Sequence, residues 1–206
     1  MSDIKLSFII NAYSRPEYLK NTLETIKRQI REDMEIIVVV DKTGQNMKGL
    51  AESYGASYYE TIYRSGDIGG PQNVGAKMAR GEWLFLTDQD CILRHDAVEI
   101  VLRHIKTKPY ARLIVEWIND SRIGYMDEEY KLNGFYEQNS GRRIKYGYEN
   151  LRNWGNAQII KRDFFLGLGG FDERFRGYSE AERDFATRTE LAGINSFYIE
   201  MILAHQ

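Results

Sequence analysis

The sequence predicts one α/β domain with a mostly parallel central sheet that is flanked by helices. Segments of strand and helix character alternate along most of the 206 residues, which is typical of parallel sheets with crossover helices. The predicted strands over 35–40 and 82–87 are largely continuous apolar runs, which indicates strands covered on both faces. The strand over 82–87 ends at Asp88-Gln89-Asp90. Ligands of open α/β sheets bind beyond such carboxyl ends.

The first helix has the clearest start signal. Ser14 is placed to cap it, Pro16 suits its first turn, and Glu17 follows Ser14 at the spacing of a capping box. Apolar residues recur at helical spacing as Leu19, Leu23, Ile26 and Ile30. We therefore expect a strand over 5–11 followed by a helix over about 14–30.

The elements that follow keep this alternation up to about residue 118. Gly55 and Gly81 are expected to end helices, and the glycine-rich segment 64–70 predicts a loop. The expected elements are a strand over 35–40, a helix over 48–54, a strand over 56–62, a helix over 71–79, a strand over 82–87, a helix over 95–106 and a strand over 110–117.

The alternation breaks at about Asn119. Residues 119–153 are polar and aromatic without clear periodicity, and such long stretches are typically functional or mobile. Regular elements then resume. They are a strand over 157–160, a helix over 162–168 ended by Gly169-Gly170, a helix over 180–191 closed by Gly193, and a strand over 195–199.

Composition narrows the class of protein. Hydrophobic residues make up 43% and charged residues 28% of the chain, and the net charge is −2, so nothing attracts it overall to nucleic acid or acidic membranes. No apolar run approaches the roughly 20 residues that span a bilayer, and no signal-peptide core follows Met1. Cys91 is the single cysteine, so we expect a reducing, cytoplasmic location.

Asp88 and Asp90 are the most informative pair of side chains. Residues two apart on an extended chain point to the same side. Two carboxylates so placed repel each other unless a cation lies between them. Oxygen ligands of this kind suit hard cations such as Mg²⁺, Mn²⁺ or Ca²⁺. A polar turn that closes the strand is the alternative reading of so short a pattern.

Five motifs along the chain together resemble the family 2 glycosyltransferases with the GT-A fold, a Rossmann-like fold for nucleoside diphosphate sugars. The similarity covers roughly residues 5–118 and 154–205. Its motifs, in the order of the family, are SFIINAYSRPEYL at 7–19, IIVVVD at 36–41, GPQNVG at 70–75, ARGEWLFLTDQD at 79–90 and GGFDE at 169–173.

The resemblance implies that a sugar is moved with inversion from a nucleoside diphosphate sugar, UDP-sugar being favoured, to an acceptor hydroxyl. Asp41 would accept a hydrogen bond from the uracil imide, with a turn role as its alternative. Asp90 would bind the metal and Asp88 would contact ribose or sugar. The other residues expected at the donor are Ala12, Tyr13, Arg15, Asn73 and Gln89, and plain packing is the alternative for Tyr13.

A histidine near the end of the chain completes the implied metal site. His205 lies just past the last predicted strand, where enzymes of this fold often supply a histidine ligand, although a tail residue is the alternative. Histidine suits Mn²⁺ better than Mg²⁺. We expect Asp90, Asp88 and His205 to hold one of these two divalent metal ions.

An inverting transfer also needs a base that removes the acceptor proton. The family places an acidic pair at the start of the helix that follows the Gly-Gly-Phe-Asp-Glu motif. Asp184 and Arg188 match the family's later Asp and Arg and set the register. The pair then falls on Ala181 and Glu182, so we expect Glu182 to be the base and Glu180 to be the reserve. Stabilisation of acids by the helix dipole is the alternative.

The acceptor side is expected in the last third of the chain. Trp154, Gly155 and Asn156 precede a strand where the family approaches the acceptor, and Gly155 permits close backbone approach. Within a single domain over 1–206, we expect a nucleotide-sugar half over 5–118, an acceptor-side insertion over 119–153, and an acceptor and base half over 154–206. A glycan, a lipid-linked glycan or a small molecule would be the acceptor, with nucleic acid as a weaker option.

Two other functions compete with a stand-alone transferase. The altered acidic pair is also consistent with a non-catalytic module that binds sugar nucleotides or glycans. A nucleotidyltransferase shares the α/β architecture, but its glycine-rich phosphate loop is absent after the first strand, where the chain reads Asn11-Ala12-Tyr13-Ser14-Arg15.

Overall fold

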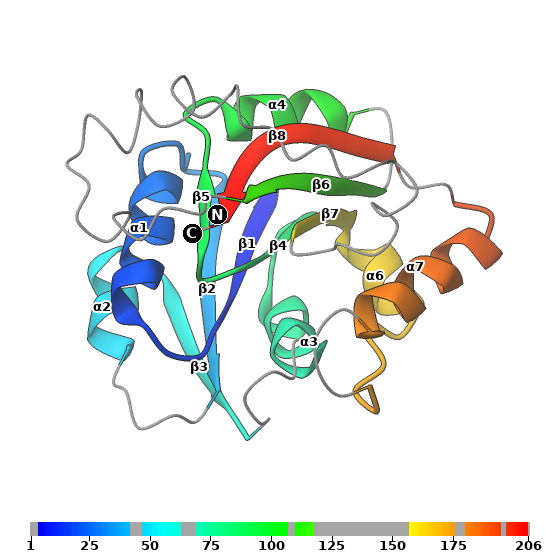
Figure 1. Ribbon diagram of the computed structural model, residues 1–206, viewed down its shortest axis with the longest axis horizontal. Coiled ribbons are helices and arrows are strands. Elements are labelled where there is room, and N and C mark those ends of the chain that lie inside the picture. The colour runs from blue at the N-terminus through cyan, green and yellow to red at the C-terminus, as the bar shows by residue number, and fades with distance from the viewer. Residues whose placement is uncertain are drawn as a thin grey trace.

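The computed structural model describes residues 4–41, 47–62, 69–106, 110–117, 157–175, 180–194 and 197–205. Its strands form one eight-stranded sheet in the order β3-β2-β1-β4-β7-β6-β8-β5 (Figure 1). The elements are β1 (Leu6–Ala12), α1 (Pro16–Lys27), β2 (Met34–Asp41), α2 (Lys48–Ser53), β3 (Ser57–Thr61), α3 (Gly69–Met78), β4 (Trp83–Asp88), β5 (Cys91–Leu93), α4 (Ala97–His104), β6 (Tyr110–Trp117), β7 (Ala157–Lys161), α6 (Arg162–Gly167), α7 (Glu180–Leu191) and β8 (Phe197–His205).

The sheet has a parallel half and a mixed half. β1 lies between β2 and β4, β3 lies outside β2, and all three of these pairings are parallel. β7 runs antiparallel to both β4 and β6, β8 is parallel to β6, and β5 is antiparallel to β8. Four of the seven pairings in the described residues are therefore parallel, and the predicted α/β class with a mostly parallel sheet is confirmed.

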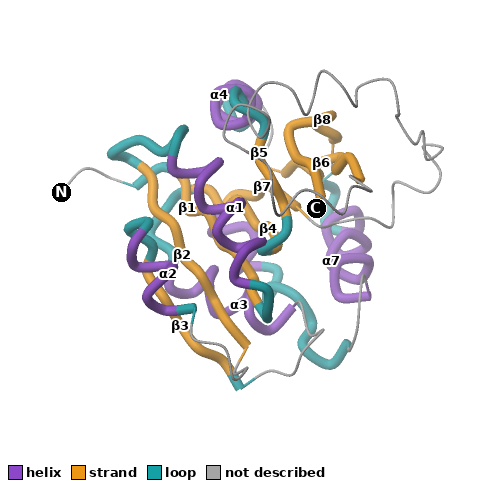
Figure 2. The backbone as a smooth tube through the Cα atoms, turned by 60° about the vertical axis from the view of Figure 1, so that its left-hand side comes forward, coloured by secondary structure: helices purple, strands orange, loops and turns teal. Residues whose placement is uncertain are grey.

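Both faces of the central strands are covered, as their continuous apolar runs predict. In β1, Phe8 and Ile10 join a core cluster with α1, α2 and α4, whereas Ile9 joins a second cluster with α3, α6 and α7. Neighbouring residues of a strand point to opposite faces, so each covered face needs its own apolar set. Figures 1 and 2 both show α7 well away from α1 and α2.

The first helix starts differently from its predicted capping box. α1 begins at Pro16, and its N-cap is Arg15 in the left-handed conformation with φ 61° and no side-chain cap hydrogen bond. The backbone N–H groups of Tyr18 and Leu19 donate instead to the Arg15 carbonyl at 3.0 and 3.4 Å. The capping role predicted for Ser14 is wrong, because the turn at Arg15 brings a main-chain carbonyl to the first turn.

Gly81 also has a different role from the predicted helix stop. α3 runs from Gly69 to Met78, and Gly81 donates its N–H to Ser7 Oγ at 2.9 Å. A Cβ at Gly81 would lie 2.7 Å from the Ser7 backbone nitrogen, so glycine is needed for the close approach of two chain segments. Gly55 and Gly193 do follow helices in the left-handed conformation, with φ 76° and 77°.

The end of the sheet was only partly predicted. β8 continues to His205, whereas the sequence indicated an end at residue 199, and the three-residue strand β5 was not predicted. The two strands pair in the register Cys91 to His205. His205 is thus the last residue of a strand and does not lie past it. No helix among the described residues combines the length and the apolar character needed to cross a membrane.

Candidate active site

The carboxyl ends of the parallel strands bring three of the predicted donor residues to one edge of the sheet. Asn11 of β1 pairs with Asp88 of β4, and Ala12 pairs with Val40, the residue before Asp41. Adjacent strands lie about 4.8 Å apart, so Asp41 and Asp88 lie on either side of β1, each about one strand spacing from its carboxyl end at Ala12. The side chain of Asp41 lies outside the described part of the chain.

Asp88 is held in a strongly anionic setting. The residue keeps some exposed surface, but its Oδ1 atom is buried and has no hydrogen-bond partner. Burial raises the pKa of Asp88 well above its usual value, and the charges of Asp90 and Glu182 raise it further against a hydrogen bond with Asn11. Carboxyl groups from the turn after β4 and from α7 therefore both act on the carboxyl group of Asp88.

Glu182 is the inward-facing acid of α7. Only 6% of the residue is exposed, and its Oε2 atom is buried without a hydrogen-bond partner. Burial raises the pKa of Glu182 to about 7, the Glu180 charge adds to this, and a backbone hydrogen bond opposes it. Glu180, by contrast, has a half-exposed side chain that pairs with Arg183 at 3.4 Å. Burial thus separates the two predicted base candidates.

Gln89, between the two aspartates, ties the turn after β4 to the first loop. Its Oε1 accepts a hydrogen bond from the Tyr13 N–H at 3.0 Å, and its own N–H donates to the Asn11 carbonyl at 2.9 Å. The Thr22 hydroxyl donates to the Gln89 carbonyl at 2.6 Å. The predicted donor residues Tyr13 and Gln89 are thus linked to each other, and Tyr13 keeps 42% of its surface exposed.

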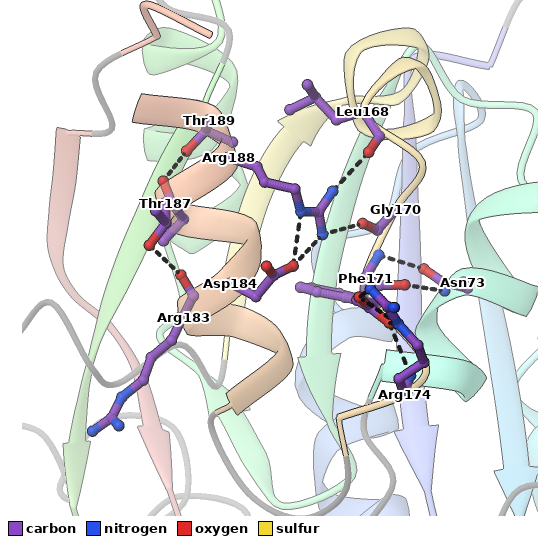
Figure 3. Close-up of polar contacts among 12 residues, drawn as sticks. Asn73, Leu168, Gly170, Phe171, Arg174, Arg183, Asp184, Thr187, Arg188 and Thr189 are labelled. Atoms are coloured by element: carbon purple, nitrogen blue, oxygen red, sulfur yellow. Dashed lines mark hydrogen bonds and ion pairs between the residues drawn. The ribbon is translucent and has the colours of Figure 1, made fainter. Parts of the chain in front are cut away.

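Asn73 is buried, and its amide is fully used for hydrogen bonding within the protein. Nδ2 donates to the Phe171 carbonyl at 2.8 Å and to Glu173 Oε1 at 2.9 Å. Oδ1 accepts from the Phe171 N–H at 2.8 Å (Figure 3). Both amide hydrogens are occupied, so in this arrangement Asn73 clamps α3 to the turn after α6. No local sequence pattern indicates this role, because Asn73 and Phe171 are 98 residues apart.

The residues around Asp88 fit a divalent metal ion by their chemistry. Asp88 and Asp90 offer hard oxygen donors. The buried Asp88 Oδ1 lacks a hydrogen-bond partner, as expected of an oxygen that would serve as a cation ligand. The backbone of His205 pairs with Cys91, next to Asp90, but its side chain is outside the described residues. Within the described residues, no three His, Cys, Asp or Glu side chains form a ready-made metal cluster.

The predicted acceptor residues Trp154, Gly155 and Asn156 lie outside the described residues, as does the insertion over 119–153. The first described residue after them is Ala157 at the start of β7, which pairs with Thr87. The chain therefore enters β7 directly beside the residue that precedes Asp88.

Known proteins resemble this chain in both sequence and fold. An uncharacterized glycosyltransferase of Haemophilus influenzae is 32% identical over 185 residues, covering 85% of this chain and 59% of the relative. The glucosyl-dolichyl phosphate glucuronosyltransferase of Haloferax volcanii is 24% identical over 181 residues, covering 82% of this chain and 56% of the relative. The chain thus spans less than two thirds of the length of these relatives.

Solved structures share the fold at low sequence identity. Staphylococcus aureus TarS matches with a TM-score of 0.74 and 15% identity over 98% of this chain and 36% of that chain. The mannosyltransferase PcManGT from Pyrobaculum calidifontis, in complex with GDP-Man and Mn²⁺, matches with a TM-score of 0.69 and 15% identity over 98% and 56%. These neighbours confirm the predicted GT-A fold. The model of the Glycosyl transferase family 2 matches residues 7–169, and the chain accordingly belongs to that family.

Proposed function

We propose that this chain transfers a sugar from a nucleoside diphosphate sugar to an acceptor hydroxyl, with inversion and with the help of a divalent metal ion. The observation that carries the proposal is the juxtaposition of Asp88 and Asp90 at the end of β4 with the buried carboxyl group of Glu182. The reaction requires a metal ion and a base. Two of these acids are suited to bind the metal ion, and the third is suited to accept the proton.

The donor is proposed to be a UDP-sugar. TarS has been crystallised with UDP-GlcNAc and PcManGT with GDP-Man, so the shared fold is compatible with more than one base. The choice of uracil rests on Asp41, whose carboxylate would accept the hydrogen bond of the imide N–H. Ala12, Tyr13 and Arg15 would border the base and ribose, at the loop that Gln89 holds.

Asp90 and Asp88, with His205 on the neighbouring strand, would hold Mn²⁺ or Mg²⁺. A bound divalent cation supplies charge neutralisation for the diphosphate leaving group. The oxygen donors of the two aspartates suit either ion, and participation of His205 would favour Mn²⁺.

Glu182 is proposed to be the catalytic base. A carboxylate whose pKa is about 7 is matched to taking a proton from an acceptor hydroxyl near neutral pH. Its Oε2 atom has no hydrogen-bond partner and so is available for that proton. Trp154, Gly155, Asn156 and the insertion over 119–153 would form the acceptor side. The single cysteine, Cys91, is buried and free, in keeping with a cytoplasmic location.

Calorimetry with UDP, with and without Mn²⁺, tests the donor site for the wild type and for Asp90→Asn. We expect binding that requires the metal and that is lost in the variant. An exposed aspartate, Asp163, provides the matched control, because Asp163→Asn should bind like the wild type. Failure of UDP to bind under any metal condition would refute the UDP assignment, and GDP, CDP and dTDP would then be measured in the same way.

Turnover separates an enzyme from a binding module of the same fold. UDP-sugars are screened for slow hydrolysis, and Glu182→Gln is compared with the wild type on the donor that is used. An enzyme should lose turnover in this variant and keep its affinity for UDP. Equal and negligible turnover of both proteins with every donor would instead support the non-catalytic module.

A further inference from the structure

The helix that carries Glu182 packs on the rest of the protein through an aromatic cluster. Phe185 of α7 contacts Phe165 and Phe171, with ring centroids 5.0 and 5.2 Å apart, and Tyr110 meets Phe185 edge-on at 6.1 Å. Apolar burial holds a helix against its neighbours but is non-directional. The rotation of α7 about its axis and its position along that axis determine where Glu182 points. Polar contacts are therefore needed to fix both.

Arg188, six residues after Glu182 in α7, makes these polar contacts. Its Nη1 donates to the Leu168 carbonyl at 2.6 Å, and its Nη2 donates to the Gly170 carbonyl at 2.7 Å. Asp184 orients the guanidinium from within α7, with its Oδ2 atom 2.7 Å from Nε. A planar guanidinium with several bonded donors fixes both distance and direction. Figure 3 shows Arg188 reaching from α7 to the residues after α6.

The same turn, Leu168–Phe171, is held from its other side by Asn73 of α3. The amide of Asn73 bonds both the N–H and the carbonyl of Phe171 at 2.8 Å. Gly170 makes room for this amide, because a Cβ there would lie 2.4 Å from Asn73 Oδ1. The turn is thus a rigid link with α3 on one side and α7 on the other.

The starts of α3 and α7 also meet directly beside the base. A Cβ added at Gly69, the first residue of α3, would lie 3.3 Å from the Cβ of Ala181, and Ala181 immediately precedes Glu182. Any change in the spacing between the two helices is therefore transmitted to Glu182 through its neighbour.

We propose that Arg188 and Asn73 are positioning residues that lock α7 against α3 through the Leu168–Phe171 turn and so fix the orientation of Glu182. The inference rests on the proposed function, in which Glu182 is the base. Neither residue touches the reacting atoms, and their contribution is the orientation of the acid that does.

Kinetics of Arg188→Met and Asn73→Asp test the consequence for catalysis. The first keeps much of the length of the side chain without its donors, and the second keeps its shape without the two N–H groups. We expect kcat to fall about 100-fold in each, as a misplaced catalytic group costs. The Kd for UDP should stay within about twofold, because neither residue belongs to the loop after β1 that Gln89 holds. The double variant should lose little more than the larger single loss, since both residues act through one turn.

Two controls separate positioning from general stability. Arg183→Met removes a guanidinium from the same helix, but Arg183 points away from the turn (Figure 3), so its kcat should match the wild type. Ser7→Ala should lower the melting temperature by removing a hydrogen bond to Glu35 at the amino end of β1, and its kcat, measured well below melting, should also be unchanged. A kcat in Arg188→Met equal to that of the wild type, with Glu182→Gln inactive, would overturn the inference and leave the proposed function intact.

Hydrogen exchange tests the clamp without any donor or turnover. In Arg188→Met, the amides of 180–191 should exchange at least about tenfold faster than in the wild type, while those of β1 and β4 keep their protection. Unchanged exchange in α7 would refute the clamp even if kcat fell. If the wild type uses no nucleoside diphosphate sugar, the proposed function fails, and this exchange result still decides whether Arg188 fixes α7.

Discussion

The two ends of strands β1 and β4 differ in whether the polar groups beside them have hydrogen-bond partners. At the amino end, Glu35 accepts hydrogen bonds from the Ser7 hydroxyl and the Arg80 N–H, both at 2.7 Å, and from the Arg80 guanidinium. Ser7 in turn accepts a bond from the Gly81 N–H. At the carboxyl end, Asp88 and Glu182 each keep a buried oxygen without a partner.

This contrast distinguishes polar groups that stabilise the fold from polar groups that are left for a ligand. Burial of an unpaired carboxylate oxygen costs free energy, whereas a satisfied network costs little or stabilises the fold. Within the part of the chain that the structure describes, the unpaired buried carboxylate oxygens of Asp88 and Glu182 belong to the edge where the parallel strands end, which is where a substrate or metal ion would satisfy those oxygens. Substitutions at the two ends should therefore have opposite effects on activity and stability.

Glu182→Gln should have the largest effect on activity and little effect on stability. Loss of a general base lowers kcat by about 10²- to 10⁴-fold. Removal of a buried acid without a partner for its Oε2 should leave the melting temperature unchanged or raise it. Steady-state kinetics and thermal unfolding of the same preparation measure both, and a large fall in melting temperature would argue that Glu182 is a structural residue.

Gly81→Ala should show the reverse pattern at the amino end. The added Cβ would lie 2.5 Å from Ser7 Oγ, and overpacking of this kind typically costs about 1–3 kcal/mol. Gly49→Ala is the matched control, because nothing lies within 4 Å of its added Cβ in α2 and alanine favours a helix by about 0.5–1 kcal/mol. Denaturant unfolding compares them, and equal stability of the two variants would contradict the close approach at Gly81.

Glu35→Gln should reveal a pH-dependent part of the stability. Burial opposes ionisation of Glu35, but hydrogen bonds from Arg80 and Ser7 lower its pKa below the ordinary 4.5. The ionised form therefore stabilises the fold above about pH 4.5, and this contribution is lost as the pH falls through the folded-state pKa. We expect the variant to be less stable by about 1–3 kcal/mol near pH 7 and the difference to shrink in acid.

Urea unfolding of Glu35→Gln and the wild type at several pH values measures this difference. The exposed residue Glu32 supplies the control, since Glu32→Gln should behave like the wild type throughout. A difference that is constant with pH would show that the Glu35 charge does not contribute.

Gln89→Met should have the smallest effect. Gln89 combines the two kinds of site, because its hydrogen bonds are satisfied and it lies between the two aspartates at the carboxyl end of β4. The variant leaves the Tyr13 N–H without its acceptor, and the loss of this hydrogen bond should destabilise the loop after β1 by about 1 kcal/mol. We expect the Kd for UDP to rise about fivefold with kcat for bound donor unchanged. Calorimetry checks this, and an unchanged Kd would mean that the loop is held without Gln89.

The sequence anticipated the parts of the fold that local patterns encode. Alternating segments and apolar runs identified the parallel half, and the bounds of α7 at 180 and 191 were predicted as observed. β5 was missed because three residues carry no periodic signal, and it is defined only by pairing with β8. The left-handed start of α1 at Arg15 has no local signature either, since a capping box was present in the sequence but is unused.

The candidate site likewise contains residues that sequence patterns predict and residues that they do not. The end of an apolar strand placed Asp88 and Asp90, and family register selected Glu182, which is also the more buried of the two acids. The clamp of Asn73 and the link between Gln89 and Tyr13 could not be foreseen, because their partners are 98 and 76 residues away. The roles of these residues toward donor and acceptor stay predictions.

The interleaved strand order has a consequence for how the molecule is made. β8 lies between β6 and β5, so residues 91–93, next to the two aspartates, find their partner strand only at 203–205. As the chain leaves the ribosome, β1 to β4 can assemble early, but the flank of the aspartate turn must wait for a strand translated much later. Contacts that distant in sequence are the slow ones to form, so competence for donor binding should be acquired last.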